Sequence, residues 1–205
     1  MIKHTREELF DALRKTYLLG FPDIKPYENA DFKIQRLELE QLVPAQNYYI
    51  KDIISKIFEL QQKLEANIFN LDGYISFYDN ELGQILSLTP PIIEKEDDKL
   101  VILDGIHRVL ASYMLDTPIN CVVVSNFDKN YLSYAKPNKT GWEQVKGFQS
   151  RVPDGFKTRE HRYGDDYRKY ARTFKFEGDV LIPRQHSLRS DLYRQLLAQD
   201  KLRHR

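Results

Sequence analysis

The chain has 205 residues, with 31 Lys and Arg against 30 Asp and Glu, and its 41% hydrophobic content is typical of a globular protein. This length allows one domain, or one domain with an appendage, whose core needs neither disulfides nor metals. The single cysteine excludes an intramolecular disulfide, and no apolar run reaches the roughly 18 residues of a membrane span. With no signal-peptide core at the N-terminus, we expect a cytoplasmic protein that is neither secreted nor bound to a membrane.

The small net charge hides an asymmetry between the two halves of the chain. Residues 1–100 contain 12 basic and 18 acidic side chains, whereas residues 101–205 contain 19 basic and 12 acidic ones. A basic second half could attract an anionic substrate or the backbone of a nucleic acid. The alternative is a solvated, charged surface.

The first third of the chain predicts a helix, a strand and a second helix. Thr5 and Glu8 have the spacing of a capping box, and the following leucines predict a helix that reaches Leu18 or Leu19 before Gly20 and Pro22 end it. Apolar residues from position 32 to 40 change parity, which predicts a short strand with a bulge or a bend. Helical spacing over 49–66 predicts an amphipathic helix that packs on a sheet. Residues 67–88 are irregular and predict a loop or a variable insertion.

The pattern is clearest between residues 90 and 125. It predicts a strand over 90–95, a hairpin turn over 96–99 and a buried strand over 100–103. A helix over 106–115 and a β-branched strand over 119–125 follow. This strand-turn-strand-helix-strand unit is the best-specified part of the chain.

Beyond residue 126 we expect an appendage wrapped on the core, with helices near 165–173 and 188–202. Lys139 and Thr140 lie in a turn-rich loop that could close over phosphates, although a solvated loop is the alternative. Aromatic residues nearby could stack on a base, or simply pack the appendage onto the core; these are Tyr131, Tyr134 and Trp142. Farther on, basic residues interleave with tyrosines in a pattern that could bind nucleic acid, but two aspartates favour an ion-paired surface instead; the basic residues are Arg159, Arg162, Arg168, Lys169 and Arg172, and the aspartates are Asp165 and Asp166.

The junction between the strand over 100–103 and the next helix has the features of an anion site. Gly105 would let a ligand approach the backbone, and the first amides of the helix, including that of Ile106, would point toward it. Arg108 adds a positive charge to a turn where a helix ordinarily prefers an acid. His107 could donate to a phosphate or act as acid or base, and Asp104 could cap the helix, hold Mg²⁺ or act as a base.

The sequence from Ile102 to Val124 resembles the nucleotide-binding turn of the ParB/sulfiredoxin-like superfamily, which reads Gly-X-His-Arg or Asp-Gly-His-His-Arg between a strand and a helix. The form present here is Asp-Gly-Ile-His-Arg, from Asp104 to Arg108. Residues 32–46 are similar to the family's first strand and proline-containing loop, and residues 90–93 to the strand before the hairpin. The resemblance therefore covers about 32–126, with an unusually long segment between 46 and 90. It implies an α/β (α+β) fold with a small mixed sheet.

The resemblance also implies how the chain is divided. Residues 1–31 would form a helical N-terminal extension and residues 32–126 the nucleotide-binding core. Residues 127–205 would form a basic, partly helical C-terminal lobe. Sulfiredoxins carry a catalytic cysteine where this chain has Ile106, and Cys121 alternates like a core residue, so sulfinic-acid reduction is not expected.

The Asp-Gly-X-His-Arg form looks most like relatives that phosphorylate a free small molecule such as serine. This resemblance implies ATP or ADP with Mg²⁺, phosphates held by residues 105–108, and Asp104 and His107 as the residues of the chemistry. In those relatives an acidic base follows the first strand, but Gln46 stands at the aligned position and cannot accept a proton from a hydroxyl. Glu38 or Glu40 could replace it, or Asp104 could be the base.

Two other functions remain open at this point. One is a ParB-like, nucleotide-dependent DNA-associated protein or nuclease whose basic C-terminal lobe contacts nucleic acid. The other is a nucleotide-sensing module without turnover, which Gln46 would permit. The sequence does not specify the acceptor, the base of the nucleotide or the oligomeric state.

Overall fold

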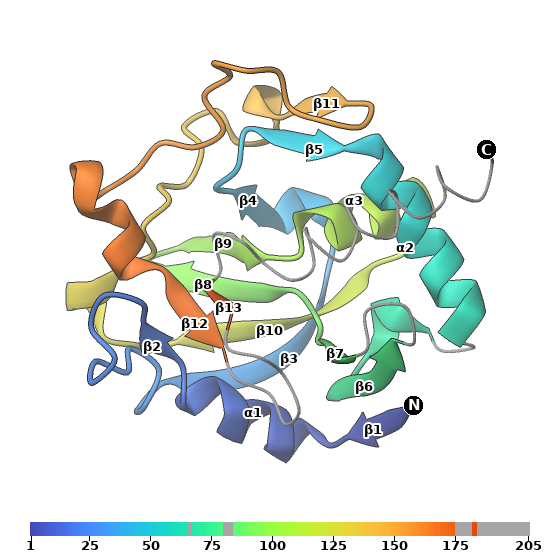
Figure 1. Cartoon of the computed structure of the whole chain (residues 1–205), viewed down its shortest axis with the longest axis horizontal. Helices are drawn as coiled ribbons and strands as arrows, with labels where there is room; N and C mark the ends of the chain where they lie inside the picture. Colours follow the sequence, from blue (N-terminus) through green and yellow to red (C-terminus); the bar gives the residue numbers. More distant parts are fainter. Residues whose placement is uncertain (65–66, 80–83, 175–181, 184–205) are drawn as a thin grey trace.

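A five-stranded mixed sheet forms the centre of the computed structural model, which describes residues 1–64, 67–79, 84–174 and 182–183 (Figure 1). The strands lie in the order β3 (Asp31–Leu37), β10 (Ile119–Ser125), β8 (Ile92–Glu96), β9 (Lys99–Asp104) and β4 (Leu42–Pro44). β10 is antiparallel to β3 and parallel to β8, whereas β9 is antiparallel to β8 and parallel to β4. The fold is α+β with a mixed sheet, as the sequence predicts.

Helices cover both faces of this sheet. Along β10, Cys121 and Val123 face α2 (Lys51–Leu64) and α3 (Ile106–Met114), while Val122 and Val124 face α1 (Arg6–Arg14). Figure 1 shows α1 below the sheet and the other two helices above it. Cys121 is completely buried, and burial raises the pKa of its thiol to about 12, so it is a core residue. No helix in the described ranges is long and apolar enough to span a bilayer.

The strand-turn-strand-helix-strand unit is confirmed. β8 and β9 form a hairpin whose turn contains Asp97 with a φ of 52°. α3 ends at Met114, and Pro118 precedes β10. Short-range signals therefore determine this part of the fold.

The N-terminal helix begins where its capping box predicts but ends earlier than expected. The Thr5 hydroxyl accepts a hydrogen bond from the Glu8 amide, and the Glu8 carboxylate accepts one from the Thr5 amide. The expectation that the helix reaches Leu18 or Leu19 is wrong, because Leu18 lies in β2 (Tyr17–Leu18). β2 pairs with β12 (Arg172–Phe174), and this long-range pairing replaces the last helical turn.

Two other expectations in the first half need correction. The parity change between Ile34 and Leu37 is not a bulge, because β3 pairs with β10 in unbroken register and the two residues face opposite sides of the sheet. β3 ends at Leu37, and a 3₁₀ helix, η1 (Leu39–Gln41), follows. Residues 67–88 are not an irregular loop. They contain η2 (Ile68–Asn70) and the strands β6 (Tyr74–Asp79) and β7 (Gln84–Leu88), which form a three-stranded sheet with β1 (Ile2–His4). Ile75 and Leu88 form a buried cross-strand pair that stabilises it.

The C-terminal lobe consists of short elements joined by extended chain. These are η3 (Lys129–Tyr131), η4 (Gly141–Gln144), β11 (Lys146–Phe148), η5 (Gly164–Tyr170), β12 and β13 (Ile182–Pro183). β11 runs parallel to β5 (Tyr48–Ile50), and β12 lies between β2 and β13. The helix expected near 165–173 is a 3₁₀ helix followed by a strand. The helix expected over 188–202 lies outside the described residues.

Two buried carboxylates on β8 hold this lobe on the core. Glu94 and Arg172 are both completely buried, and the Arg172 Nε donates to Glu94 Oε1 at 3.0 Å. The Tyr27 hydroxyl also donates to this carboxylate, and burial followed by the nearby Glu94 charge raises the pKa of Tyr27. Two residues along the strand, the Glu96 carboxylate accepts hydrogen bonds from both terminal nitrogens of Arg162.

These ion pairs agree with the ion-paired alternative that the sequence favours for the basic segment. Arg162 and Arg172 are directed into the protein, and the Lys169 ammonium lies 2.8 Å from Asp166. Tyr163 and Tyr170 stack on each other with ring centroids 3.6 Å apart. Much of the basic and aromatic pattern therefore joins the lobe to the core.

The lobe should lose stability when Arg172 is removed. Arg172→Met leaves the Glu94 charge buried without its cation and should lower the free energy of unfolding by about 3–5 kcal/mol in urea titrations. Arg168→Met, at an exposed position, should change it by less than about 0.5 kcal/mol. The double variant Arg172→Met/Glu94→Gln should regain part of the loss, because it leaves no buried charge at position 94 without its cation. Equal effects at positions 172 and 168 would contradict this account.

Candidate functional site

The candidate site is the turn that joins β9 to α3. Gly105 has a φ of 96° and a ψ of 19°, a left-handed conformation that favours glycine, and it caps α3 without a side-chain hydrogen bond. The Arg108 and Val109 amides donate to the Gly105 carbonyl. In the described part of the chain, the amides of Ile106 and His107 have no acceptor. The turn therefore presents backbone donors at the positive end of a helix.

Glycine is required at position 105 for a second reason. A Cβ built on Gly105 would lie 2.8 Å from the Cβ of Pro91, at the start of β8. The turn is thus packed against the neighbouring strand and has a fixed shape. A ligand would meet a preformed backbone surface.

The Arg108 side chain stabilises this turn from inside. Its guanidinium is only 3% exposed and donates to Asp104 Oδ2 at 2.8 Å and to the carbonyl of Thr89. These contacts tie the turn to the residues before β8. A phosphate would reach this guanidinium only by replacing a partner that it already has, and phosphate binding by Arg108 stays a prediction.

His107 links α3 to β5. Its Nε2 accepts a hydrogen bond from the Ile50 amide at 3.0 Å, which places the ring hydrogen of the neutral form on Nδ1. Burial, and to a smaller extent the positive charges of Arg108 and Arg159, lower the pKa of His107 to about 4, although Asp104 opposes this. His107 is therefore neutral at pH 7 and can donate through Nδ1. At that pH its Nε2 is occupied by the Ile50 amide.

Gln46 meets the C-terminal lobe at this site. Its side-chain nitrogen donates to the Tyr48 carbonyl at 2.7 Å, and its oxygen accepts from Arg159 at 2.6 Å. The Ile50 amide of the same strand as Tyr48 donates to His107, so β5 brings Gln46, His107 and Arg159 into one neighbourhood. The sequence places Arg159 only in the basic segment and gives no sign of this contact.

The loop that could close over phosphates lies at the edge of the site. Lys139 and Thr140 are exposed, and Asn138 before them donates to the Gln46 carbonyl at 3.3 Å. The loop is therefore attached near Gln46, while a contact of Lys139 or Thr140 with phosphate stays a prediction.

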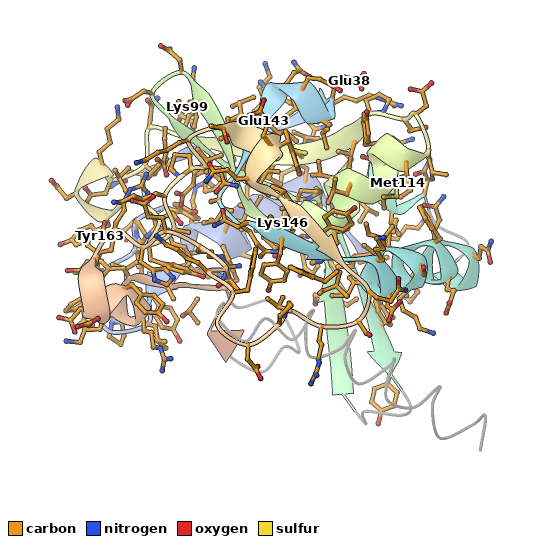
Figure 2. The ribbon with its side chains drawn as sticks, turned by 90° about the horizontal axis from the view of Figure 1, so that it is seen from above. Glu38, Lys99, Met114, Glu143, Lys146 and Tyr163 are labelled. Atoms are coloured by element: carbon orange, nitrogen blue, oxygen red, sulfur yellow. The ribbon has the colours of Figure 1, made fainter. Side chains whose placement is uncertain are left out.

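The aromatic residues of the lobe are used for packing. The half-buried Trp142 indole packs on the main core and donates to the carbonyls of Leu39 and Leu42, which favours the packing alternative over base stacking. Tyr134 is buried in a small cluster with Ala135. Figure 2 looks down on this side of the molecule, with Glu143 and Lys146 near the middle and Tyr163 toward one end.

The alternative acids lie in η1 or beside it. Glu38 and Glu40 are both exposed, and the Glu38 amide donates to the Gln41 side chain. Among the described residues no three His, Cys, Asp or Glu side chains are grouped so that they could hold a metal ion. Asp104 is the carboxylate at the turn itself.

The whole of this turn lies inside a stretch that matches a known family model. The ParB CE domain matches residues 8–146. The chain belongs to the ParB CE domain family. The resemblance to ParB-like proteins is thus confirmed, while the closer comparison with free serine kinases stays a prediction. Comparisons of this ParB CE domain with curated proteins and with solved structures gave no match.

The family match ends before Arg159. The ParB CE match covers residues 8–146 and so includes Gln46, His107 and the whole β9–α3 turn. Arg159 lies 13 residues beyond the end of the match. The neighbourhood of the turn therefore combines residues from the matched part and from the lobe.

Substitution of Gly105 should separate the two roles of this glycine. Gly105→Ala strains the left-handed backbone and also brings a methyl group against Pro91. Gly155→Ala is the matched control, because Gly155 has a φ of 77° but no atom within 4 Å of the position that a methyl group would take. We expect Gly155→Ala to cost about 1–2 kcal/mol in chemical denaturation and Gly105→Ala clearly more. An equal loss of stability in Gly105→Ala and Gly155→Ala would show that Pro91 can move away from the added methyl group at little cost.

The buried neutral His107 should make stability depend on pH. Its pKa of about 4 lies below the value of about 6.5 in the unfolded chain, so the unfolded state binds more protons between these values. Its contribution is full above about pH 6.5 and is lost as the pH falls toward 4. Over that window it should amount to roughly 3 kcal/mol.

The control for this prediction is His107→Gln, which keeps an acceptor for the Ile50 amide but cannot titrate. Urea unfolding at pH 7 and pH 4.5 should show a smaller loss of stability for the variant than for the parent. Parallel pH profiles would mean that His107 titrates normally in the folded protein.

Proposed function

We propose that this ParB CE domain binds a nucleotide, with the phosphates at the first turn of α3, and transfers a phosphoryl group to a small hydroxylated acceptor. The observation that carries the proposal is the packed Gly105 turn, which leaves the Ile106 and His107 amides without acceptors among the described residues, inside a ParB-like domain. Such amides at a helix N-terminus are ready-made donors for phosphate oxygens. The Nδ1 hydrogen of His107 adds a side-chain donor.

The transfer reaction needs a base for the acceptor. The acceptor hydroxyl oxygen would attack the terminal phosphorus of ATP while the bond to the bridging oxygen breaks and ADP leaves. The hydroxyl proton would pass to the Asp104 carboxylate, because the Nε2 of His107 is already bonded to the Ile50 amide. Arg108 holds that carboxylate in place through Oδ2, and the backbone donors of the turn would stabilise the charge on the transferred group.

Magnesium would come to this site with the nucleotide. Mg²⁺ in phosphate-transferring proteins is often held by one or two carboxylates together with the phosphates, and it neutralises their charge. Asp104 is the carboxylate at the turn, but its Oδ2 already receives Arg108. The residues thus fit a metal bound mainly by phosphates better than a metal bound by the protein.

A second candidate is a nucleotide-dependent DNA-associated protein, and membership of the ParB CE family is the observation that favours it. The charge distribution is compatible, since residues 101–205 carry an excess of basic side chains. The two candidates share the phosphate site and differ in whether the nucleotide is consumed by an acceptor or controls binding to DNA.

One set of measurements tests both candidates. We expect ATP or ADP with Mg²⁺ to raise the melting temperature, with about 2.7 kcal/mol of stabilisation at 100 times the dissociation constant, and adenosine to have little effect. Phosphorus NMR with a panel of hydroxylated acceptors, serine included, should show ADP formed from ATP only when an acceptor is present. Asp104→Asn should bind the nucleotide without turnover.

Other outcomes point elsewhere. Selectivity for CTP, together with DNA binding that weakens steeply with salt in fluorescence anisotropy, would favour the DNA-associated function. Stabilisation without turnover or DNA binding would indicate a sensing module. If millimolar ATP, ADP, CTP and GTP all leave the melting temperature unchanged, the proposed function is wrong.

A further inference from the structure

Arg159 is a half-buried cation without an acidic partner among the described residues. Elsewhere in that part of the chain, each arginine either forms an ion pair or is exposed; the paired ones are Arg6, Arg14, Arg108, Arg162 and Arg172, and the exposed unpaired ones are Arg36, Arg151 and Arg168. Arg159 lies between these classes and bonds only to a neutral amide, the side-chain oxygen of Gln46. Partial burial of a charge without a counter-ion is unfavourable.

The segment that carries Arg159 is firmly held. The Asn47 amide donates to the Thr158 carbonyl and the Lys136 amide to the Glu160 carbonyl, each at 2.8 Å. The Arg162 amide donates back to the Tyr134 carbonyl, also at 2.8 Å. The backbone on both sides of Arg159 is thereby fixed between two other segments of the chain. An unpaired charge kept in one place by so many bonds points to a ligand rather than to a surface side chain in solvent.

The guanidinium itself is also oriented. Its NH2 group donates to Gln46 Oε1 at 2.6 Å, and its central carbon lies 5.8 Å from the centroid of the Tyr134 ring. Gln46 is held in turn by its own bond to the Tyr48 carbonyl. Within the described residues, the remaining N–H groups of Arg159 have no acceptor. A guanidinium with several free donors in a fixed plane suits the two oxygens of a phosphate.

Arg159 is connected to the candidate site through β5, because its partner Gln46 donates to the Tyr48 carbonyl and the Ile50 amide of the same strand donates to His107 in the first turn of α3. In keeping with this position, the Arg159 charge is one of the causes that lower the pKa of His107. The neighbourhood then holds the full positive charge of Arg159, the partial charge of the helix and donors from two amides and an imidazole. In contrast, the carboxylate of the turn, Asp104, is already paired with Arg108.

We propose that Arg159 binds the terminal phosphate of the nucleotide and that Gln46 orients it, so that residues 157–161 complete a site that begins in the family-matched part of the chain. The proposal rests on the proposed function, since it takes the phosphates to lie at the first turn of α3. It predicts a preference for nucleotides with a terminal phosphate over nucleosides. It also gives Gln46 a positioning role. The Gln46 amide orients the Arg159 guanidinium but, being neutral, does not cancel its positive charge, which stays available for a ligand.

Isothermal titration calorimetry of the full chain tests this role of Arg159 with ATP and adenosine as ligands. Arg159→Ala should weaken ATP binding about 10- to 100-fold and leave adenosine binding unchanged, and Arg159→Lys should restore only part of the loss. Arg151→Ala is the matched control, because Arg151 is exposed on the same connection between β11 and η5. ATP affinity that is equal in the parent and in Arg159→Ala would overturn the inference.

A second variant tests the same contact without removing the arginine. Gln46→Glu has nearly the same shape and gives Arg159 a carboxylate partner, so the melting temperature should stay the same or rise. ATP affinity should fall about tenfold, because the new ion pair competes with the phosphate. Unchanged ATP affinity in a folded Gln46→Glu variant would also overturn the inference.

Inorganic tripolyphosphate separates a failure of this inference from a failure of the proposed function. If tripolyphosphate binds in an Arg159-dependent manner but no nucleotide binds, the anion site stands and the nucleotide proposal is wrong. If ATP binds equally well to all variants, the nucleotide proposal stands and the role of Arg159 is wrong. If the parent binds neither ligand, both are wrong.

Discussion

The structure depends on the buried ion pair between Glu94 and Arg172. Glu94 lies on β8, the central strand of the mixed sheet, and Arg172 comes from a strand that pairs with β2 rather than with that sheet. Neither side chain is exposed, so each charge is tolerable only because the other is present. With Glu96 and Arg162 forming a second contact on the same strand, the path of the lobe across the core is fixed at two points. Arg159 lies three residues before one of these fixed points, which keeps it near Gln46.

At the turn itself, the side chains that the sequence suggests for chemistry are used mainly to build the site. Arg108 neutralises Asp104 and fastens the turn, and the neutral imidazole of His107 receives an amide from β5. What remains without an acceptor among the described residues is a set of donors: two helix amides, the Nδ1 hydrogen and part of the Arg159 guanidinium. Such a set suits the anion that we propose for this site, and the proposed transfer would then leave the proton to Asp104 or to groups on the substrate.

Elements whose contacts are close in the sequence could be predicted, and elements whose contacts are distant in the sequence could not. The unit from β8 to β10 was predictable because its signals are local: a Glu-Asp-Asp-Lys turn, runs of β-branched residues and a glycine before a helix. β2 and β4 are short strands whose partners, β12 and β9, lie far along the chain, and no clear periodicity develops over two or three residues. The helix expected to reach Leu18 is the clearest case, since its pattern is helical but β12 pairs with that residue.

The same distinction applies to the candidate site. Gly105 and the turn could be predicted from the sequence because the residues that form the turn, 104–108, follow one another in the chain. The pairing of Asp104 with Arg108 was also accessible, since the two residues are four apart. In contrast, Arg159 and Gln46 are 113 residues apart, and nothing in either local sequence indicates that they meet. Nor could sequence show that burial and a bond from Ile50 would keep His107 neutral.

The ion pairs on β8 also bear on what counts as a unit of this protein. The family match ends at residue 146, yet the cations that neutralise Glu94 and Glu96 lie at positions 172 and 162. The family match is therefore shorter than the stretch of chain that supplies both carboxylates together with their cations, which extends to Arg172. A fragment cut at the end of the family match would leave both carboxylates in the core without their cations. The border of the family match is therefore not the border of a stable unit.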